Sequence, residues 1–388
     1  MTDISSMTIK AQIKAQHCFH GSSEAKGGIK RYIDSLMQLY QDHCSIPPIG
    51  NLDGVDQSQF ELLHVHDQLL LWQIQHKCPV VFTLHNHSPY CPSGTRYLVS
   101  SQQPCDRPLS IMGCTWGHLV DGCGSRKPQK IWQNFSGTFK DTDIILKYQV
   151  PVIAISRYVQ DQLISLGIPK TQIFLLHHGI PAPDVKFTPI SPDMHRQRRI
   201  LYAGRVVPYK GLDWLLKALA QVNPQIHLDI AGSGWAQSDM EKLAKQLGVD
   251  DRITWHGWCT QPQLDALYQQ CFTLILPSLW HEPAGLVSLE AYVRYRPVIA
   301  SASGGIPDYV IHNETGLLVQ PNHVQQLAAA ITHLADSFST AVMMGSQGNQ
   351  LFQERFTLER HRQKLETIYE IAVENFSPKK QRYSSSRD

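Results

Sequence analysis

From residue 198 onward, short runs of apolar and β-branched residues alternate with longer segments in which apolar residues recur at helical spacing. The strand-like runs are 198–206, 226–232, 253–258, 272–278, 297–301 and 315–320, and the helical segments are 211–222, 240–247, 262–270, 286–294 and 324–336. Strands that alternate with helices through short loops are typical of parallel sheets with right-handed crossovers. The pattern predicts a doubly wound α/β domain of the Rossmann type.

The first half of the chain shows the same alternation less regularly. It predicts strands at 9–18, 61–66, 79–85, 150–156 and 173–178, and helices at 29–40 and 157–166. Only about 20 residues separate the first helix from the second strand. We therefore expect this domain to lack one strand–helix unit.

A cluster of prolines between residues 181 and 192 ends this periodicity and marks a linker. We expect an N-terminal Rossmann-like domain at 1–185, a linker at 186–197, a second Rossmann-like domain at 198–355, a C-terminal helix at 356–376 that crosses back to the first domain, and a disordered tail at 377–388. Two such domains face each other across a cleft. Ligands of open parallel sheets bind beyond the carboxyl ends of the strands, so the loops that follow the strands should carry the chemistry.

The loop after the first strand of the second domain carries two cations. Arg205 and Lys210 lie five residues apart, between Gly204 and the start of a predicted helix. Arg forms paired hydrogen bonds to phosphate oxygens, Lys adds a point charge, and a helix start adds free N–H donors. The loop is interpreted as a diphosphate clamp, with two solvated surface cations as the alternative. In the next loop, Gly232 and Gly234 form a GxG that permits close backbone approach to a ligand.

A pair of carboxylates marks a third loop. Glu282 lies in the loop itself, and Glu290, eight positions further on, lies about one and a half turns inside the helix that starts near Gly285. We expect one carboxylate to face a sugar and the other to reach a second hydroxyl-bearing ring. Between them, the free amides of Gly285 and Leu286 form an anion site.

These loops occur in the order and spacing of a known family. GR-x4-KG, the Glu-x7-Glu pair inside PSLWHEPAGLVSLEA, PVIAS-x-GGIPD and TGLLV resemble motifs of the retaining glycosyltransferases of family 4, which belong to the GT-B glycosyl transferases group 1. The resemblance implies two Rossmann-like domains and a nucleotide-sugar donor held mainly by the second. It also implies transfer of a hexose-type sugar from a nucleoside-diphosphate sugar to an acceptor hydroxyl with retained anomeric configuration.

The family motifs assign roles to residues of the second domain. By motif match, Arg205 and Lys210 bind the donor diphosphate, Glu282 binds the transferred sugar, and Glu290 binds the ribose hydroxyls. The donor site is completed by loop residues whose backbone approaches the ligand, namely Gly204, Gly232, Gly234, Pro283, Ala284, Gly285 and Leu286.

The first domain matches the family more loosely. Gly27 and Gly28 resemble the glycine loop that approaches donor phosphate and acceptor, and His85 occupies the place of the histidine beside the reacting sugar. His178 stands where the family usually has Asn. His66 also ends a predicted strand, and we interpret it as a histidine with a structural hydrogen bond.

Two further features depart from the family pattern. Tyr295 stands where Gly usually ends the helix after Glu290, and because a left-handed non-Gly residue costs about 1 kcal/mol, we expect this helix to end differently. The second feature is a stretch from 86 to 130 that is far longer than an ordinary loop. It contains Cys91, Cys105, Cys114 and Cys123 without a CxxC pair, which leaves bound zinc, a disulfide or free thiols as alternatives.

Composition limits the partners. Lys+Arg 35 against Asp+Glu 33 argues against a general nucleic-acid binder and gives little support to polybasic membrane docking. No apolar run approaches the roughly 18 to 20 residues that span a bilayer, and the first residues lack the order of a signal peptide. We expect a cytoplasmic protein, in peripheral contact with the inner face of a membrane if the acceptor is lipid-linked rather than a free carbohydrate.

The chemistry should need no cofactor. The one Asp-x-Asp, at 141–143, lies outside every donor motif and is interpreted as solvated charge at a helix end. Arg205 and Lys210 would take the place of a metal. Two rival functions are a non-catalytic nucleotide-sugar-binding protein of the same fold, and a metal-dependent hydrolase using His64, His66, His85 and His87, in which each His-x-His pair lies on one strand face.

Overall fold

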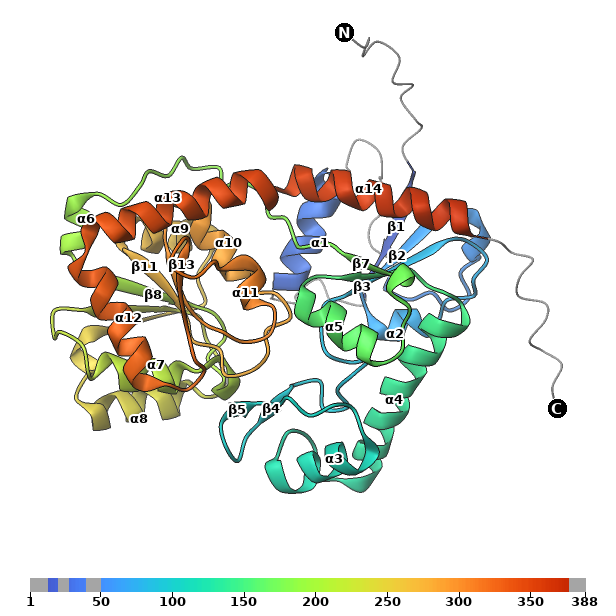
Figure 1. Cartoon of the computed structure of the whole chain (residues 1–388), viewed down its shortest axis with the longest axis horizontal. Coiled ribbons are helices and arrows are strands. Elements are labelled where there is room, and N and C mark those ends of the chain that lie inside the picture. Colours follow the sequence, from blue (N-terminus) through green and yellow to red (C-terminus); the bar gives the residue numbers. More distant parts are fainter. Residues whose placement is uncertain (1–12, 20–27, 40–49, 377–388) are drawn as a thin grey trace, which may run out of the picture.

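A computed structural model describes residues 13–19, 28–39 and 50–376, and it contains two parallel sheets (Figure 1). The first sheet has the order β1-β2-β3-β6-β7. Its strands are β1 (Ala15–Cys18), β2 (Leu62–Val65), β3 (Val80–Leu84), β6 (Val152–Ala154) and β7 (Ile173–Leu175). The strands are buried on both faces, between α1 (Gly28–Leu39), α2 (Gln68–Leu71), α5 (Arg157–Ser165) and the C-terminal helix.

The second sheet has the order β10-β9-β8-β11-β12-β13. Its strands are β8 (Arg199–Ala203), β9 (His227–Ala231), β10 (Ile253–Gly257), β11 (Thr273–Leu276), β12 (Val298–Ser301) and β13 (Gly316–Val319). The helices of this domain are α7 (Leu212–Leu219), α8 (Gln237–Leu247), α9 (Gln261–Gln270), α10 (Leu286–Tyr292), α11 (Ile306–Tyr309), α12 (Val324–Asp336) and α13 (Phe338–Arg355). The order reverses at β8, which makes the sheet doubly wound. The predicted fold of two Rossmann-like domains is confirmed.

The last helix connects the two domains. α13 lies along the second domain, and α14 (Leu358–Asn375) continues over the first, as the red helices in Figure 1 show. Leu365 and Tyr369 of α14 are buried with Tyr32 and Leu36 of α1. The predicted return of the C-terminal helix is therefore confirmed, while the predicted disordered tail lies outside the described residues.

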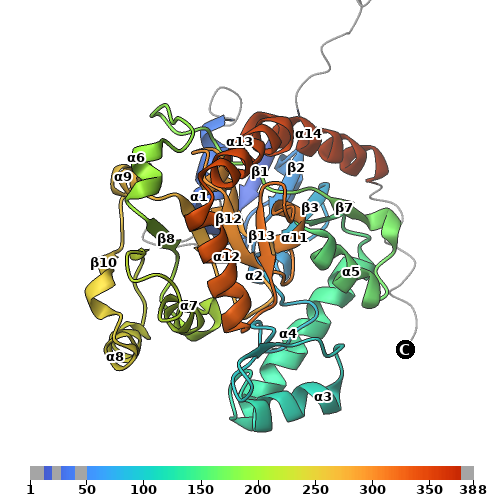
Figure 2. The same ribbon diagram turned by 60° about the vertical axis from the view of Figure 1, so that its left-hand side comes forward.

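The long stretch from 86 to 130 is an ordered insertion. It forms a hairpin of β4 (Tyr97–Leu98) and β5 (Gln103–Pro104), the short helix α3 (Ile111–Trp116) and a π-helical turn (Gly117–Asp121), and it leads into α4 (Pro128–Lys147). In both views α3 and the start of α4 lie together at the end of the molecule opposite α14 (Figure 1 and Figure 2).

The structure of helix α4 shows that the interpretation of Asp141 from the sequence was wrong. Asp141 is not solvated charge at a helix end, because it is buried within α4, where its Oδ1 accepts a hydrogen bond of 2.6 Å from Trp72 Nε1. Gly137, which interrupts the apolar pattern, makes room for the ring of the same tryptophan: a Cβ there would lie 3.3 Å from Trp72. Packing against α2 thus explains both the helix and its unusual residues.

In the part of the chain described, no single helix combines the length and hydropathy of a membrane span. α12 and α13 meet these criteria only together, across a bend of 101°.

Candidate active site

The centre of the candidate site is a buried ion pair between two loops at the carboxyl end of the second sheet. Lys210 Nζ lies 2.5 Å from Glu282 Oε1, and Ser278 donates a second hydrogen bond of 2.5 Å to the same oxygen. The ammonium also lies 5.1 Å from the ring centre of Trp280, within cation–π range. Burial alone would raise the pKa of Glu282, but Lys210 and Ser278 outweigh it and hold that pKa below its usual value. Glu282 is therefore ionised at neutral pH.

Glycine permits the two loops to meet. Gly211 adopts φ 72°, and a Cβ there would lie 1.8 Å from the carbonyl oxygen of Pro277. On the other side, a turn holds the Glu282 backbone: Gly305 donates its N–H to the Glu282 carbonyl at 2.6 Å. A Cβ on Gly304, which adopts φ 60°, would lie 2.4 Å from the same oxygen. Backbone contacts from both neighbouring loops therefore fix the position of Glu282.

Arg205 lies in the same loop as Lys210 but is exposed. Its guanidinium is 5.8 Å from the ring centre of Tyr209 and makes no ion pair with the described residues. The GxG glycines lie directly beside it: a Cβ on Gly232 would lie 1.8 Å from the Gly204 carbonyl oxygen, and one on Gly234 would lie 2.1 Å from that of Val206. The close backbone approach that these glycines permit is thus to the Arg205 loop.

The residues of the predicted anion site lie at the start of a helix. Gly285, at φ 116°, caps α10, and Leu286 is its first residue. The loop residues Pro283 and Ala284, which lead into it, are buried. The sequence placed this helix correctly but was wrong about its end, because Tyr295 adopts the left-handed conformation at φ 58° that Gly would adopt there.

Glu290 of α10 faces the first domain. Its Oε1 lies 3.3 Å from Arg31 on α1. Gly28, at the start of the same helix, is also close to α10, since a Cβ there would lie 3.4 Å from Leu286 Cδ1. Gly27 lies outside the described residues. Arg31 was given no role from the sequence, so its ion pair with Glu290 between the domains was missed.

His85 ends β3 inside a chain of buried histidines. His66 Nδ1 lies 3.0 Å from His85 Nε2, and His66 Nε2 lies 2.9 Å from His17 Nδ1. The structural hydrogen bond expected for His66 is therefore present. The other ring nitrogen of His85, Nδ1, is buried and has no hydrogen-bond partner among the described residues. Burial lowers the pKa of His85 to about 3, so the ring is neutral.

A second group of rings extends this cluster. Tyr32 lies against His178 with ring centres 4.2 Å apart, and its hydroxyl is 2.7 Å from His361 Nε2. His178 in turn stacks on His85 at 5.2 Å. The histidine that replaces the usual Asn thus connects His85 to the C-terminal helix.

The proposed metal-hydrolase set does not come together. The ligand atoms of His17, His64 and His66 lie within 4.8 Å of one another, but Nδ1 of His17 and both nitrogens of His64 and His66 are already hydrogen-bonded, those of His64 to Tyr369 and Thr83. His87 is bonded elsewhere, to Tyr90 and to the carbonyl of His281. The arrangement is a histidine hydrogen-bond network rather than four convergent ligands.

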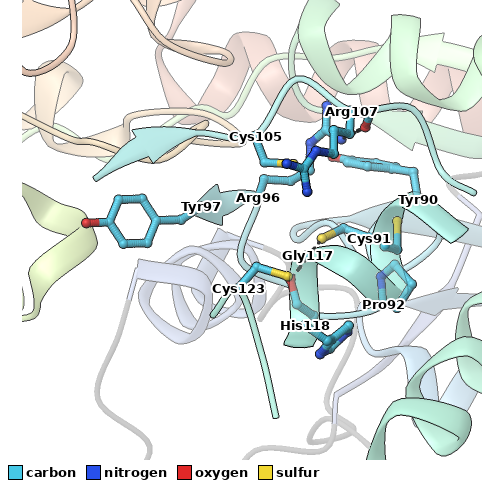
Figure 3. Close-up of a pocket in the computed structure, with 13 residues that line it drawn as sticks. Tyr90, Cys91, Pro92, Arg96, Tyr97, Cys105, Arg107, Gly117, His118 and Cys123 are labelled. Carbon is cyan, nitrogen blue, oxygen red and sulfur yellow. Dashed lines mark hydrogen bonds between the residues drawn. The ribbon is translucent and has the colours of Figure 1, made fainter. Parts of the chain in front are cut away.

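The insertion contacts the loops of the second domain that carry Glu282 and Lys210. Asp106 accepts a hydrogen bond of 2.9 Å from His281, next to Glu282, and the rings of Tyr97 and Tyr209 lie 6.4 Å apart. The four cysteines of the insertion line one small pocket (Figure 3). The cysteines were recognised from the sequence, but these contacts were not, because nothing in the local pattern of the chain indicates them.

Comparison with known proteins supports the resemblance of the second domain to glycosyl transferases group 1. Residues 188–351 match the family described as glycosyl transferases group 1. D-inositol 3-phosphate glycosyltransferase of Mycolicibacterium smegmatis is 34% identical over 199 residues, which cover 48% of this chain and 45% of that protein. A GDP-mannose-dependent phosphatidylinositol monomannoside mannosyltransferase of Mycobacterium tuberculosis is 30% identical over 215 residues, covering 51% and 56%. The chain spans about half the length of the curated relatives it matches.

Solved structures resemble most of the chain. HepE from Anabaena in complex with UDP has a TM-score of 0.70 at 19% identity, covering 93% of this chain and 100% of HepE. Sucrose-phosphate synthase from Thermosynechococcus elongatus has a TM-score of 0.71 at 21% identity, covering 93% and 99%. The two Rossmann-like domains therefore form a GT-B fold.

Proposed function

We propose that this protein is a metal-independent, retaining glycosyltransferase that moves a hexose-type sugar from a nucleoside-diphosphate sugar to an acceptor hydroxyl. The observation that carries the proposal is the juxtaposition of the exposed Arg205, the Lys210–Glu282 ion pair and the start of α10 at one sheet edge. The family match of the second domain and the complexes of HepE with UDP and UDP-glucose support it.

The leaving diphosphate would be neutralised by fixed groups. The Lys210 ammonium has three donors, of which Glu282 uses one, so donors remain for phosphate oxygens. Arg205 supplies a guanidinium with no competing carboxylate among the described residues, and the amides at Gly285 and Leu286 point from a helix start. Such preorganised charge stabilises a developing diphosphate without a metal ion.

The two carboxylates would hold different parts of the donor. Glu282 is ionised and fixed in position, which suits hydrogen bonds to sugar hydroxyls. Glu290 would take the ribose hydroxyls, in exchange for or alongside Arg31. His85 would use its unpartnered Nδ1 toward the reacting sugar or acceptor. The acceptor would be a carbohydrate or a lipid-linked sugar, in the cytoplasm or at the inner face of a membrane.

The test is a transfer assay with nucleotide sugars in excess EDTA, followed by NMR of the product. We expect turnover without added metal and the donor's anomeric configuration in the product. An inverted product, or activity that returns only with Mg²⁺ or Mn²⁺, would refute the mechanism. A protein that binds nucleotide sugars but turns over none, with any candidate acceptor, would favour the non-catalytic alternative.

A further inference from the structure

The pocket inside the insertion brings together four thiols that are distant in sequence. Cys91 follows β3, Cys105 follows β5, Cys114 lies on α3 and Cys123 follows the π-helical turn, yet all four line one cavity of about 20 Å³. A cavity of this size holds about one water molecule or one ion. Within the described residues, none of these cysteines forms a disulfide. Figure 3 labels Cys91, Cys105 and Cys123 around this space.

A buried cation lies in the same pocket. Arg96 is 4% exposed, and its guanidinium donates to Tyr158 Oη at 2.9 Å and to the Arg107 carbonyl at 2.5 Å. No carboxylate of the described residues forms an ion pair with it. Arg96 also adopts φ 46°, a conformation that costs energy for a non-glycine residue and persists where its surroundings demand it. Burying a guanidinium without a counter-charge lowers the stability of the folded state, so a negatively charged group in this pocket would be stabilising.

We propose that Cys91, Cys105, Cys114 and Cys123 bind one zinc ion. On binding, the four thiols lose four protons and four S–Zn bonds form, which leaves a tetrathiolate complex with net charge −2 beside Arg96. Tetrahedral Zn–S bonds of about 2.3 Å place sulfurs about 3.8 Å apart. The thiols do not yet have this spacing, because among the described residues only the trio His17, His64 and His66 lies within 4.8 Å. Zinc therefore draws the sulfurs inward across the cavity.

The metal would stabilise the contacts of the insertion with His281 and Tyr209 in the loops of the proposed donor site. Asp106, which bonds His281, directly follows Cys105, and Tyr97, which meets Tyr209, directly follows Arg96. This consequence for donor binding rests on the proposed function, whereas metal binding itself does not.

The first experiment measures zinc in the purified full-length protein. We expect about one zinc per chain, released by a thiol-reactive mercurial and lost in each variant Cys91→Ser, Cys105→Ser, Cys114→Ser and Cys123→Ser. The matched control Cys259→Ser, a partly buried cysteine of the second domain, and the variant His64→Gln should keep it. Zinc that is retained in the four serine variants but lost in His64→Gln would overturn the proposal in favour of the histidine trio.

A second measurement does not depend on whether the variants fold. Wild-type protein loaded with Co²⁺ should show the intense visible absorption of tetrahedral thiolate coordination, and chelation should lower its unfolding temperature. Protein that stays free of metal in the presence of zinc, with free or disulfide-bonded cysteines in the insertion, would overturn the proposal whether or not transferase activity is found.

The outer face of the same insertion carries a second, independent feature. Ile111, Met112, Trp116, Leu119 and Val120 are all exposed, Met112 by 86%. Positions 112, 116 and 119–120 recur at helical spacing, so they share one side of the segment that begins with α3. Residues between them, Gly113, Cys114 and Gly117, line the cysteine pocket. The segment therefore turns its small residues inward and its large apolar residues to solvent.

Basic residues adjoin this apolar stripe. Arg126, Lys127 and Lys130 are exposed, and Trp132, on the first turns of α4, is 76% exposed. The one acidic residue between 111 and 132, Asp121, is paired with Arg107. An exposed apolar stripe beside unpaired cations is the composition of a segment that lies in the interface of an anionic membrane.

The geometry points to this surface, residues 111–132, as a docking site for an anionic lipid bilayer. Co-sedimentation with vesicles of equimolar phosphatidylcholine and phosphatidylglycerol tests it, with pure phosphatidylcholine as the comparison. We expect binding to the anionic vesicles that weakens at high salt and falls at least about tenfold in the double variant Trp116→Ser/Trp132→Ser. The matched control Trp235→Ser, an equally exposed tryptophan of the second domain, should bind normally.

Two outcomes would overturn the membrane site. One is wild-type protein that does not bind the anionic vesicles. The other is self-association in solution that Trp116→Ser/Trp132→Ser abolishes while vesicle binding is unchanged, which would make this surface an interface between copies of the chain.

Discussion

Mild acid should destabilise this protein strongly, because its first domain buries a cluster of neutral histidines. The cluster comprises His17, His64, His66, His85, His178 and His361. Burial lowers the pKa of each ring, to about 4 for His17 and His361 and to about 3 for His85. Burial also holds the pKa of His64, His66 and His178 well below the usual value, with neighbouring rings adding to the effect.

The direction of the pH effect on stability follows from which state, folded or unfolded, binds more protons. Below pH 6.5 an unfolded histidine binds a proton that the folded ring does not, so the unfolded state gains stability as the pH falls. Between pH 7 and 6 each neutral ring lowers the free energy of unfolding by about 0.7 kcal/mol, and the six rings together lower it by about 4 kcal/mol. Asp141 has the opposite effect. Burial raises its pKa to about 7, so the folded state binds this proton at a higher pH than the unfolded state does, which adds about 1 kcal/mol to the free energy of unfolding.

The six rings and Asp141 together therefore lower the free energy of unfolding by about 3 kcal/mol from pH 7 to 6, and by about as much again by pH 5.5. A typical domain has only about 5 to 15 kcal/mol of stability, so the first domain should lose its packing near pH 5.5. Urea unfolding at a series of pH values measures the free energy of unfolding by linear extrapolation.

A variant isolates the cause. His178→Asn should reduce the dependence on pH by about 1 kcal/mol per pH unit below 6.5, whereas His333→Asn, at an exposed position of α12, should leave it unchanged. If the free energy of unfolding is the same at pH 7 and 5.5, the histidines are not buried and neutral together, and the reasoning fails.

Three further predictions concern the proposed donor site. Arg205→Ala and Lys210→Ala should each lower kcat/KM by a factor that corresponds to a loss of about 2 to 4 kcal/mol of transition-state stabilisation. Only Lys210→Ala should also lower the Tm, because it leaves the buried Glu282 carboxylate without its ion-pair partner. Near-normal kcat/KM in both variants would contradict the assignment of these residues to a diphosphate clamp. Glu290→Gln should weaken nucleotide binding in calorimetry, whereas Glu282→Gln should reduce turnover with nucleoside diphosphate affinity nearly unchanged, and the reverse pattern would mean that the roles are exchanged. His66→Phe should reduce kcat more than it raises KM, because His85 Nε2 loses its partner; unchanged kinetics would show that this bond does not position His85.

The local pattern was sufficient for most of the fold. Six strands of the second domain were predicted within a few residues. All except the edge strand β10 are largely buried, so they are continuous apolar runs, and the helices between them keep a regular apolar face. The position of Glu282 in a loop and of Glu290 inside α10 also followed from spacing alone. Helix α4 was missed, since Gly137 breaks its pattern and only the ring of Trp72 explains that glycine.

The two-domain α/β architecture and the residue types of the loops that follow the strands can therefore be predicted from the local pattern of the chain. Which of these residues meet depends on the folded structure. Lys210 pairs with Glu282 across 72 positions and Arg31 approaches Glu290 from the other domain, distances in sequence that no local periodicity encodes. The same holds for the histidine cluster and the cysteine pocket, whose members come from separate strands, loops and helices. Local propensity acts over a few residues, whereas burial and charge pairing depend on contacts that exist only once the chain has folded.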